Sequence, residues 1–380
     1  MENVYFDNSA TTRIDEEVLR EIMPFFKENY GNASSIYKLG RTSKKAIEES
    51  REKIAKAINA NPEDIYFTAG GSESDNTIIK GIAHFNKNKG NHIVTSKIEH
   101  PAVLETCKQL EQEGFEVTYI NVNNNGIIDL EELKKSITEN TILISIMFAN
   151  NEIGTIQPIK EIGEIARKHK IVFHTDAVQA IGSVPIDVKK LNIDSLSMSA
   201  HKFYGPKGIG ALYVKNGIKF RKLIAGGHQE KDKRAGTENV AGIVGMGKAI
   251  EIATNNIAGH NEKIQKLRDY YISEIKEKIP NIKINGDLEK RLPGNANISF
   301  ESIKGDSLLF NLDLKGICAS SGSACSSGSI DPSHVLKAIK APENFLNNSL
   351  RISIGKYNTK EEVDYLIKNL IEVVNRLREI

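Results

Sequence analysis

The chain has 380 residues, and its 51 Lys and Arg nearly balance its 49 Asp and Glu, giving a formal net charge of +2. This balance argues against a dedicated nucleic-acid surface. No segment approaches the roughly 18 consecutive apolar residues of a membrane span, and residues 1–5 lack the basic and then apolar pattern of a signal peptide. We therefore expect a cytoplasmic protein without a nucleic acid or membrane partner.

The length suits a large domain accompanied by a smaller one. Three cysteines, Cys107, Cys318 and Cys325, form no C-x-x-C pair and have no histidine at metal-ligand spacing. Neither a disulfide framework nor a structural zinc site is expected, and we predict no metal.

The chain opens with a short strand at 4–6, followed by a polar turn at 7–12 whose side chains can cap a helix beginning near Asp15. Apolar residues on one face predict a surface helix over 42–58. Strand patterns then alternate, mostly, with helical ones; the strands are predicted at 64–68, 92–95, 116–120, 142–147, 171–174, 195–198 and 209–214. This alternation predicts an α/β fold with a largely parallel sheet, which binds ligands at the carboxyl ends of its strands.

A polar tract at 226–237 follows the last of these strands and is typical of a long functional loop. Beyond it, a helical stretch at 240–279 leads to a smaller C-terminal domain with strands near 282–284, 296–300 and 350–354. In the final helix, Thr359 and Glu362 form a capping box ahead of an apolar stripe.

The stretch around Lys202 is the centre of the functional interpretation. Lys202 follows a short strand and precedes a glycine-rich turn, so its amine lies at the edge of the sheet. A neutral lysine amine can form a Schiff base with a carbonyl cofactor such as pyridoxal phosphate (PLP), which also supplies an electron sink. The alternative is a surface lysine in a turn.

Other strand ends carry groups that suit a phosphorylated pyridine. Residues 70–72, Gly-Gly-Ser, open a helix and can present backbone N–H groups and a hydroxyl to a phosphate. His100 can stack on a flat ring or move a proton, Asp176 can pair with a pyridine nitrogen, and Asn151 follows the strand at 142–147. The alternatives are backbone geometry for the glycines, an ordinary helix start for His100 and helix capping for Asp176. Together with Lys202, the combination is hard to assign to chance.

With these motifs the sequence resembles the cysteine desulfurases of the NifS/IscS type, which are PLP enzymes of aminotransferase fold type I, class V. The resemblance runs almost end to end and is carried by residues 5–12, 67–76, 99–103, 150–154, 174–179, 199–202 and 234–239. It implies a large PLP-binding domain at 15–260 with a mostly parallel seven-stranded sheet. It also implies a smaller α+β domain, formed by 1–14 and 261–380, that carries a catalytic cysteine loop.

Residue by residue, the resemblance implies Lys202 as the Schiff-base lysine, Asp176 on the pyridinium nitrogen and His100 stacked on the ring. Gln179 and Asn151 would lie near the ring hydroxyl and the substrate. The phosphate would be held by Gly71, Ser72, Ser199 and His201, joined by Thr237 from the partner subunit of a homodimer.

Three positions depart from the family pattern: Ser72 often corresponds to Thr, Ala33 to Pro and Tyr37 to His. Ser72 keeps the hydroxyl. The other two leave the role of the loop at 32–37 open without changing the expected chemistry.

Cys325 lies in a run of small polar residues at 319–329 that is unsuited to a packed core and favours a mobile loop with an exposed thiol. The resemblance implies that Cys325 takes up the sulfur. Cys107, on an apolar-patterned helix, and Cys318, at a strand end, are interpreted as packing residues.

Arg351 lies in the strand at 350–354, where its guanidinium could hold a substrate carboxylate through two parallel hydrogen bonds. A structural ion pair is the alternative. The resemblance implies the carboxylate role.

The expected reaction converts L-cysteine to L-alanine and leaves a persulfide on Cys325, with Lys202 and His100 moving protons. The sulfur would then pass to an acceptor protein, such as an iron–sulfur scaffold or a tRNA-thiolation protein. A selenocysteine lyase, an aminotransferase of the same fold and a catalytically idle sulfur carrier are the rival interpretations.

Overall fold

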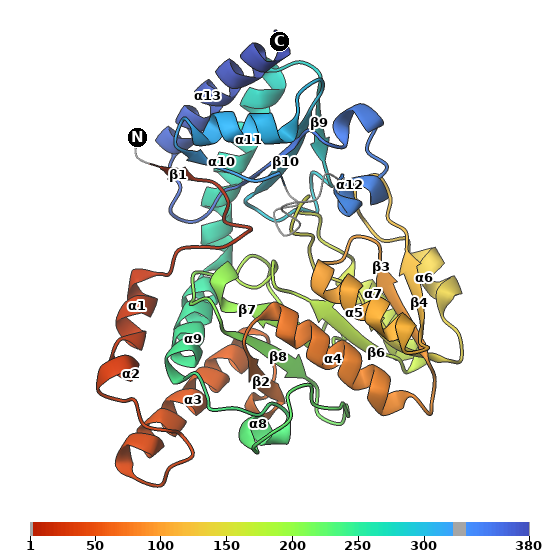
Figure 1. The fold of residues 1–380 in the computed structure, drawn as a ribbon, viewed down its shortest axis with the longest axis vertical. Helices are drawn as coiled ribbons and strands as arrows, with labels where there is room; N and C mark the ends of the chain where they lie inside the picture. Colours follow the sequence, from red (N-terminus) through yellow and green to blue (C-terminus); the bar gives the residue numbers. More distant parts are fainter. Residues whose placement is uncertain (1–2, 322–331, 380) are drawn as a thin grey trace.

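The computed structural model describes residues 3–321 and 332–379. Its two parts are visible in Figure 1, in which the larger sheet and its helices lie below and a smaller sheet lies above. The long helix α10 (Ile257–Lys278) runs up into the smaller part. Within these described ranges, no helix is long and apolar enough to cross a membrane.

The larger sheet has seven strands in the order β2-β8-β7-β6-β5-β3-β4. The pairs from β7 to β4 are parallel, whereas β8 is antiparallel to both of its neighbours. The strands are β2 Ile65–Thr68, β3 His92–Ser96, β4 Glu116–Ile120, β5 Thr141–Ser145, β6 Val172–Asp176, β7 Ser195–Ser199 and β8 Gly210–Val214. The mostly parallel α/β sheet expected from the sequence is confirmed. The antiparallel β8 arises because a short connection, not a crossover helix, joins β7 to β8.

Both faces of this sheet are buried, and alternate residues of its strands enter two different cores. On β3, Ile93 packs with the helices α4 (Gly71–Asn86) and α5 (Pro101–Gln112). Its neighbour Val94 belongs to the core on the other face, which includes residues of α3 (Lys38–Ala57), α7 (Ile159–His169) and α9 (Val240–Asn255). The period of two residues explains the division, since successive side chains point to opposite faces.

The smaller part is built on the antiparallel sheet β12-β10-β9, with β9 Ile282–Asn285, β10 Asn295–Phe300 and β12 Ser349–Ser353. The first strand of the chain, β1 (Val4–Tyr5), pairs here with β11 (Ile317–Cys318). A separate apolar core joins Phe6 to residues of α10, α11 (Gly305–Asp313) and α13 (Lys360–Arg378). The domain bounds expected from the sequence stay a prediction, and the burial of Phe6 in this core supports them.

In the described part of the chain, the remaining helices are α1 Glu16–Ile22, α2 Pro24–Lys27, α6 Leu130–Ser136, α8 Gln229–Asp232 and α12 His334–Ala338, and the short 3-10 turns are η1 Pro62–Asp64, η2 Ala200–Lys202 and η4 Glu343–Phe345. The predicted helix at 240–279 is two helices, because Asn256 leaves the helical conformation and its side chain caps α10 by accepting from the N–H of Gly259. The capping box of Thr359 and Glu362 is confirmed.

Candidate active site

Lys202 closes the short turn η2, directly after β7, as the sequence indicates. Its Nζ donates to the backbone carbonyls of Ser9, at 2.6 Å, and Ala10, at 2.7 Å. The polar turn near the N-terminus therefore lies across the carboxyl end of the sheet. The amide of Gln179 donates to the same Ser9 carbonyl at 2.9 Å, which places Gln179 beside the lysine.

A cavity of about 430 Å³ opens at the start of α4. Four residues expected to hold a phosphate line it together: Gly71, Ser72, Ser199 and His201. A Cβ at position 71 would lie 2.6 Å from the Cγ2 of Val178, so this turn has no room for a side chain. The free N–H groups and positive end of a 16-residue helix favour an anion in such a place.

His201 and Lys207 give this cavity two nitrogen donors of different character. Burial, followed by the nearby charge of Lys202, lowers the pKa of His201 to about 4, so the imidazole is neutral near pH 7. Its Nδ1 lies 3.2 Å from the hydroxyl of Thr11. Lys207 lines the same cavity and adds a cation that sequence reasoning did not assign to the site. Its position in the glycine-rich turn after Lys202 was the available signal.

Asp176, at the end of β6, and His100, in the turn after β3, approach each other across the end of β5, which lies between these two strands. Asp176 is the last residue of β6, is 6% exposed and accepts a hydrogen bond from the N–H of Val178 at 2.9 Å. His100 caps α5 by accepting from the N–H of Ala102 at 3.1 Å. Burial raises the pKa of Asp176, and the nearby His100 ring, the N–H of Val178 and the charge of Lys202 oppose that rise. Burial lowers the pKa of His100, so the ring favours its neutral form.

A third group, Asp75 of α4, joins this pair. One ligand atom from each of Asp75, His100 and Asp176 lies within 4.8 Å of the other two. Such a trio could also coordinate a cation, and the absence of a metal stays a prediction. Sequence reasoning missed Asp75, because it lies within a helix and not at a strand end.

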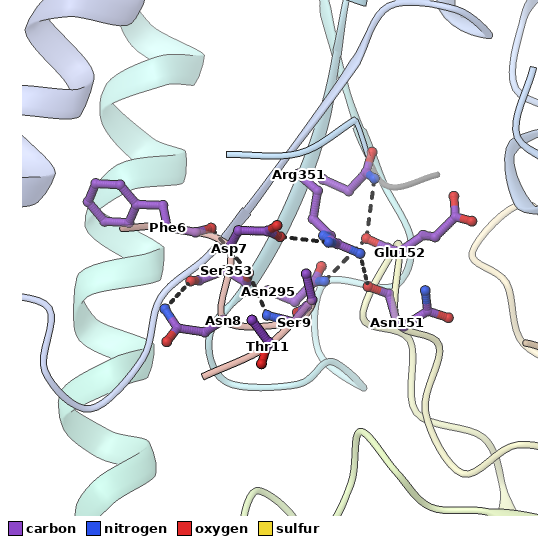
Figure 2. A network of polar contacts seen from close by, with 12 residues as sticks. Phe6, Asp7, Asn8, Ser9, Thr11, Asn151, Glu152, Asn295, Arg351 and Ser353 are labelled. Atoms are coloured by element: carbon purple, nitrogen blue, oxygen red, sulfur yellow. Dashed lines mark hydrogen bonds and ion pairs between the residues drawn. The ribbon is translucent and has the colours of Figure 1, made fainter. Parts of the chain in front are cut away.

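Arg351 is the middle residue of β12, the edge strand of the smaller sheet, and is 2% exposed. Figure 2 shows its side chain between two neighbours. Its Nη2 is 2.7 Å from the carboxylate of Asp7, and its Nη1 donates to the backbone carbonyl of Asn151 at 3.1 Å. The ion pair considered as the alternative at the sequence level is therefore present. The carboxylate-binding role of Arg351 and the role of the Asn151 side chain stay predictions.

Two expected site residues are not brought into this arrangement. Thr237 is exposed and is not among the residues that line the cavity at α4, and its role in a partner subunit stays a prediction. Cys325 lies outside the described residues. Of the other cysteines, Cys107 is buried in an apolar core, as expected, and burial raises its pKa to about 12. Cys318 is half-buried on β11.

The mostly parallel seven-stranded sheet, with polar turns at its strand ends, agrees with the fold of the aminotransferase class of enzymes. A family model described as "Aminotransferase class-V" matches residues 4–366, and the chain belongs to that family.

Within the family, the relatives that match the whole chain carry a more specific name. A protein of Clostridium botulinum (strain Hall) named "Cysteine desulfurase IscS" is 56% identical over 379 residues, covering 99% of this chain and 96% of the relative. One of the same name from Methanosarcina thermophila is 57% identical over 377 residues, covering 99% and 93%.

Solved structures agree in fold. A structure described as "NIFS-LIKE PROTEIN" superposes with a TM-score of 0.93 at 41% identity, covering 98% of this chain and all of the other. Another, described as "SspA in complex with cysteine", has a TM-score of 0.83 at 38% identity, covering 93% and 99%.

Proposed function

We propose that the chain is a cysteine desulfurase, in which L-cysteine and the thiol of Cys325 give L-alanine and a persulfide on Cys325. The observation that carries the proposal is the convergence of Lys202, Asp176 and His100 beside a cavity suited to an anion. The full-length relatives named as cysteine desulfurases support the same activity.

The residues present fit PLP. The cavity at the start of α4 has no room for a side chain at Gly71, and the buried carboxyl of Asp176 needs a cationic partner, which a protonated pyridine nitrogen would provide. Gly71, Ser72, Ser199 and His201 would hold the phosphate, and Lys202 would carry the cofactor. Bound PLP would supply the carbonyl that captures the substrate amine and the sink for its electrons.

The protein's own groups then bind the substrate and move its protons. Arg351, with Asn151 beside it, would orient the carboxylate of L-cysteine, and Gln179 would lie near the ring hydroxyl of bound PLP. Lys202, already held at the sheet edge by the carbonyls of Ser9 and Ala10, removes the Cα proton. His100, neutral by burial, assists proton transfer.

Sulfur transfer is assigned to Cys325. Its thiolate attacks the substrate sulfur, and the bond between this sulfur and Cβ of the substrate breaks. Cβ then takes up a proton, which gives alanine. The persulfide then passes its sulfur to an acceptor, an iron–sulfur scaffold or a tRNA-thiolation protein. A homodimer with Thr237 in the partner's site, and a cytoplasmic location, stay predictions.

The test measures alanine and sulfide released from L-cysteine and a reductant by the PLP-loaded protein. Equal amounts from the wild type, lost in Cys325→Ala but kept in the matched control Cys318→Ala, are expected. Release of a keto acid would indicate an aminotransferase instead. Activity indifferent to Cys325 would contradict the sulfur-transfer step, and a protein that binds no PLP would contradict the proposal as a whole.

A further inference from the structure

Asp75 is a buried acid to which the proposed chemistry gives no role. It lies on α4 and is 1% exposed. Its Oδ1 has no hydrogen-bond partner among the described residues. The ring of His174 lies beside it, with its Nε2 3.6 Å from this oxygen. An unpaired buried carboxylate would be costly at this position.

His174 does not supply the missing positive charge. It is fully buried on β6, and its Nδ1 and Nε2 lie 2.9 Å and 3.0 Å from the hydroxyls of Ser145 and Ser197. Burial lowers its pKa to about 3, so the ring is neutral over the physiological range. On this side, therefore, Asp75 contacts only uncharged groups among those described, namely the His174 ring and the neighbouring hydroxyls.

On its other side Asp75 faces Asp176, with a carboxyl oxygen of each within 4.8 Å. Two buried carboxylates at this separation cannot both remain ionised, because their repulsion is poorly screened. The pair therefore holds one proton and one negative charge, in the manner of other carboxyl pairs.

The surroundings decide which of the two acids keeps the proton. Asp176 accepts the N–H of Val178 and is stabilised as an anion by the charge of Lys202. Among the described residues no comparable cation acts on Asp75: burial first, and then the charge of Asp176, raises its pKa well above the usual range, and the Ser197 hydroxyl opposes that rise. Among the described residues, the groups around the two acids lie on β6, on β7, on η2 and in the turn before α5, which carries Glu99 and His100.

We propose that Asp75 is a positioning residue for Asp176: as an un-ionised acid behind it, Asp75 leaves the single negative charge of the pair on the carboxyl that faces the cofactor ring. The proposal rests on the proposed function, since it gives Asp176 the pyridine nitrogen as its partner. Asp75 takes no part in the chemical steps. It sets the charge and orientation of a group that does.

The spectroscopic test compares Asp75→Asn with Asp176→Asn in the PLP-loaded protein. Asn has the size of a neutral Asp. In Asp75→Asn, the pH midpoint of the cofactor's absorbance should therefore stay within about 0.3 unit of the wild-type value, and the affinity for PLP within about twofold. Asp176→Asn should lower the midpoint by at least about one unit and the affinity by about tenfold or more. Equal shifts in both variants would overturn the proposal, because they would show that Asp75 is charged.

The second test uses the protein without cofactor, and so does not depend on the proposed function. Native Asp75 keeps a proton that the unfolded chain releases, so the free energy of unfolding should fall as pH rises from about 5 to about 7. In Asp75→Asn, the free energy of unfolding should fall less steeply with pH. The change in slope should correspond to at most about one proton fewer released on unfolding. Asp75→Ser serves in its place if the Asn variant does not fold. Parallel slopes in wild type and variant would overturn the proposal, whereas failure of the wild type to bind PLP would remove the proposed function alone.

Discussion

The carboxylate of Asp7 lies 2.7 Å from the Nη2 of Arg351, joining the turn after the first strand to the edge strand of the smaller sheet. Arg351 is 2% exposed, whereas the side chain of Asp7 is 17% exposed. A substrate carboxylate that uses this guanidinium would meet a carboxylate already bound there. The pair therefore ties two distant segments together, and if Arg351 binds the substrate, Asp7 would compete with the substrate carboxylate for the guanidinium.

Replacing Arg351 by Met should raise the KM for L-cysteine about tenfold to a hundredfold, because a charge-assisted hydrogen bond is worth about 1.5–3 kcal/mol. Steady-state kinetics of alanine formation measure the effect. Asp7→Asn is the matched control. It removes the competing charge and should leave KM unchanged or lower it. If the ion pair is purely structural, both Arg351→Met and Asp7→Asn should lower stability, and the KM for L-cysteine should be the same in the two variants.

Glu99 predicts a pH dependence of stability. It is 1% exposed, and its Oε1 accepts from the Ser96 hydroxyl at 2.5 Å and from the N–H of Met147 at 3.0 Å. Burial, with the charge of Asp176, raises its pKa from 4.5 to about 8. The folded protein thus keeps a proton that the unfolded chain releases between these values, and the stabilisation is full below this window and is lost as pH rises through it.

The free energy of unfolding should therefore fall by at most about 1.4 kcal/mol per pH unit on account of Glu99. Urea denaturation across that range measures the slope. Glu99→Gln keeps the shape and removes the titration, so its slope should be flatter. An unchanged slope in Glu99→Gln would show that this carboxyl is ionised in the native protein.

The residues at the strand ends could be found from the sequence because each apolar strand is followed abruptly by polar residues. Asp176 and Lys202 follow such strands, and parallel strands bring their carboxyl ends to one edge. Asp75 could not be found in this way. It lies inside an amphipathic helix, and only packing against His174, 99 residues further along the chain (174 minus 75), shows that it is buried.

The same limit applies to the contacts between the two parts of the chain. Sequence patterns predicted the strand that carries Arg351 and the turn that carries Asp7, but not that these segments meet. A parallel bridge between Asp7 and Ser353 brings them together, and such pairing depends on long-range register that local periodicity does not contain.

Gly71→Ala should weaken cofactor binding through a steric route. The new Cβ would lie 2.6 Å from the Cγ2 of Val178, whose N–H donates to Asp176. Overpacking of this kind costs about 1–3 kcal/mol, which corresponds to about fivefold to a hundredfold in affinity if the bound state bears it. Titration of PLP into the cofactor-free protein measures it. Val178→Ala in the same chain should restore affinity; a double variant as weak as the single one would contradict the clash.

Arg51→Met should destabilise the protein strongly. Its guanidinium makes a buried ion pair with Glu230, with contacts of 2.8 and 2.9 Å, and both side chains are no more than 5% exposed. Glu230 also accepts the N–H of Phe67 at 2.8 Å and lies in a left-handed segment with a φ of 46°. Removing Arg51 leaves this carboxylate buried without its cation, which costs about 3–5 kcal/mol.

Urea denaturation checks this loss against Arg13→Met, since the pair of Arg13 and Glu16 is exposed and should be worth less than about 1 kcal/mol. Adding Glu230→Gln to Arg51→Met removes the stranded charge but keeps an acceptor for the N–H of Phe67, so part of the stability should return. A loss in Arg51→Met no greater than in Arg13→Met would show that water or another cation neutralises Glu230, and that the ion pair does not hold the segment before Thr237 in place.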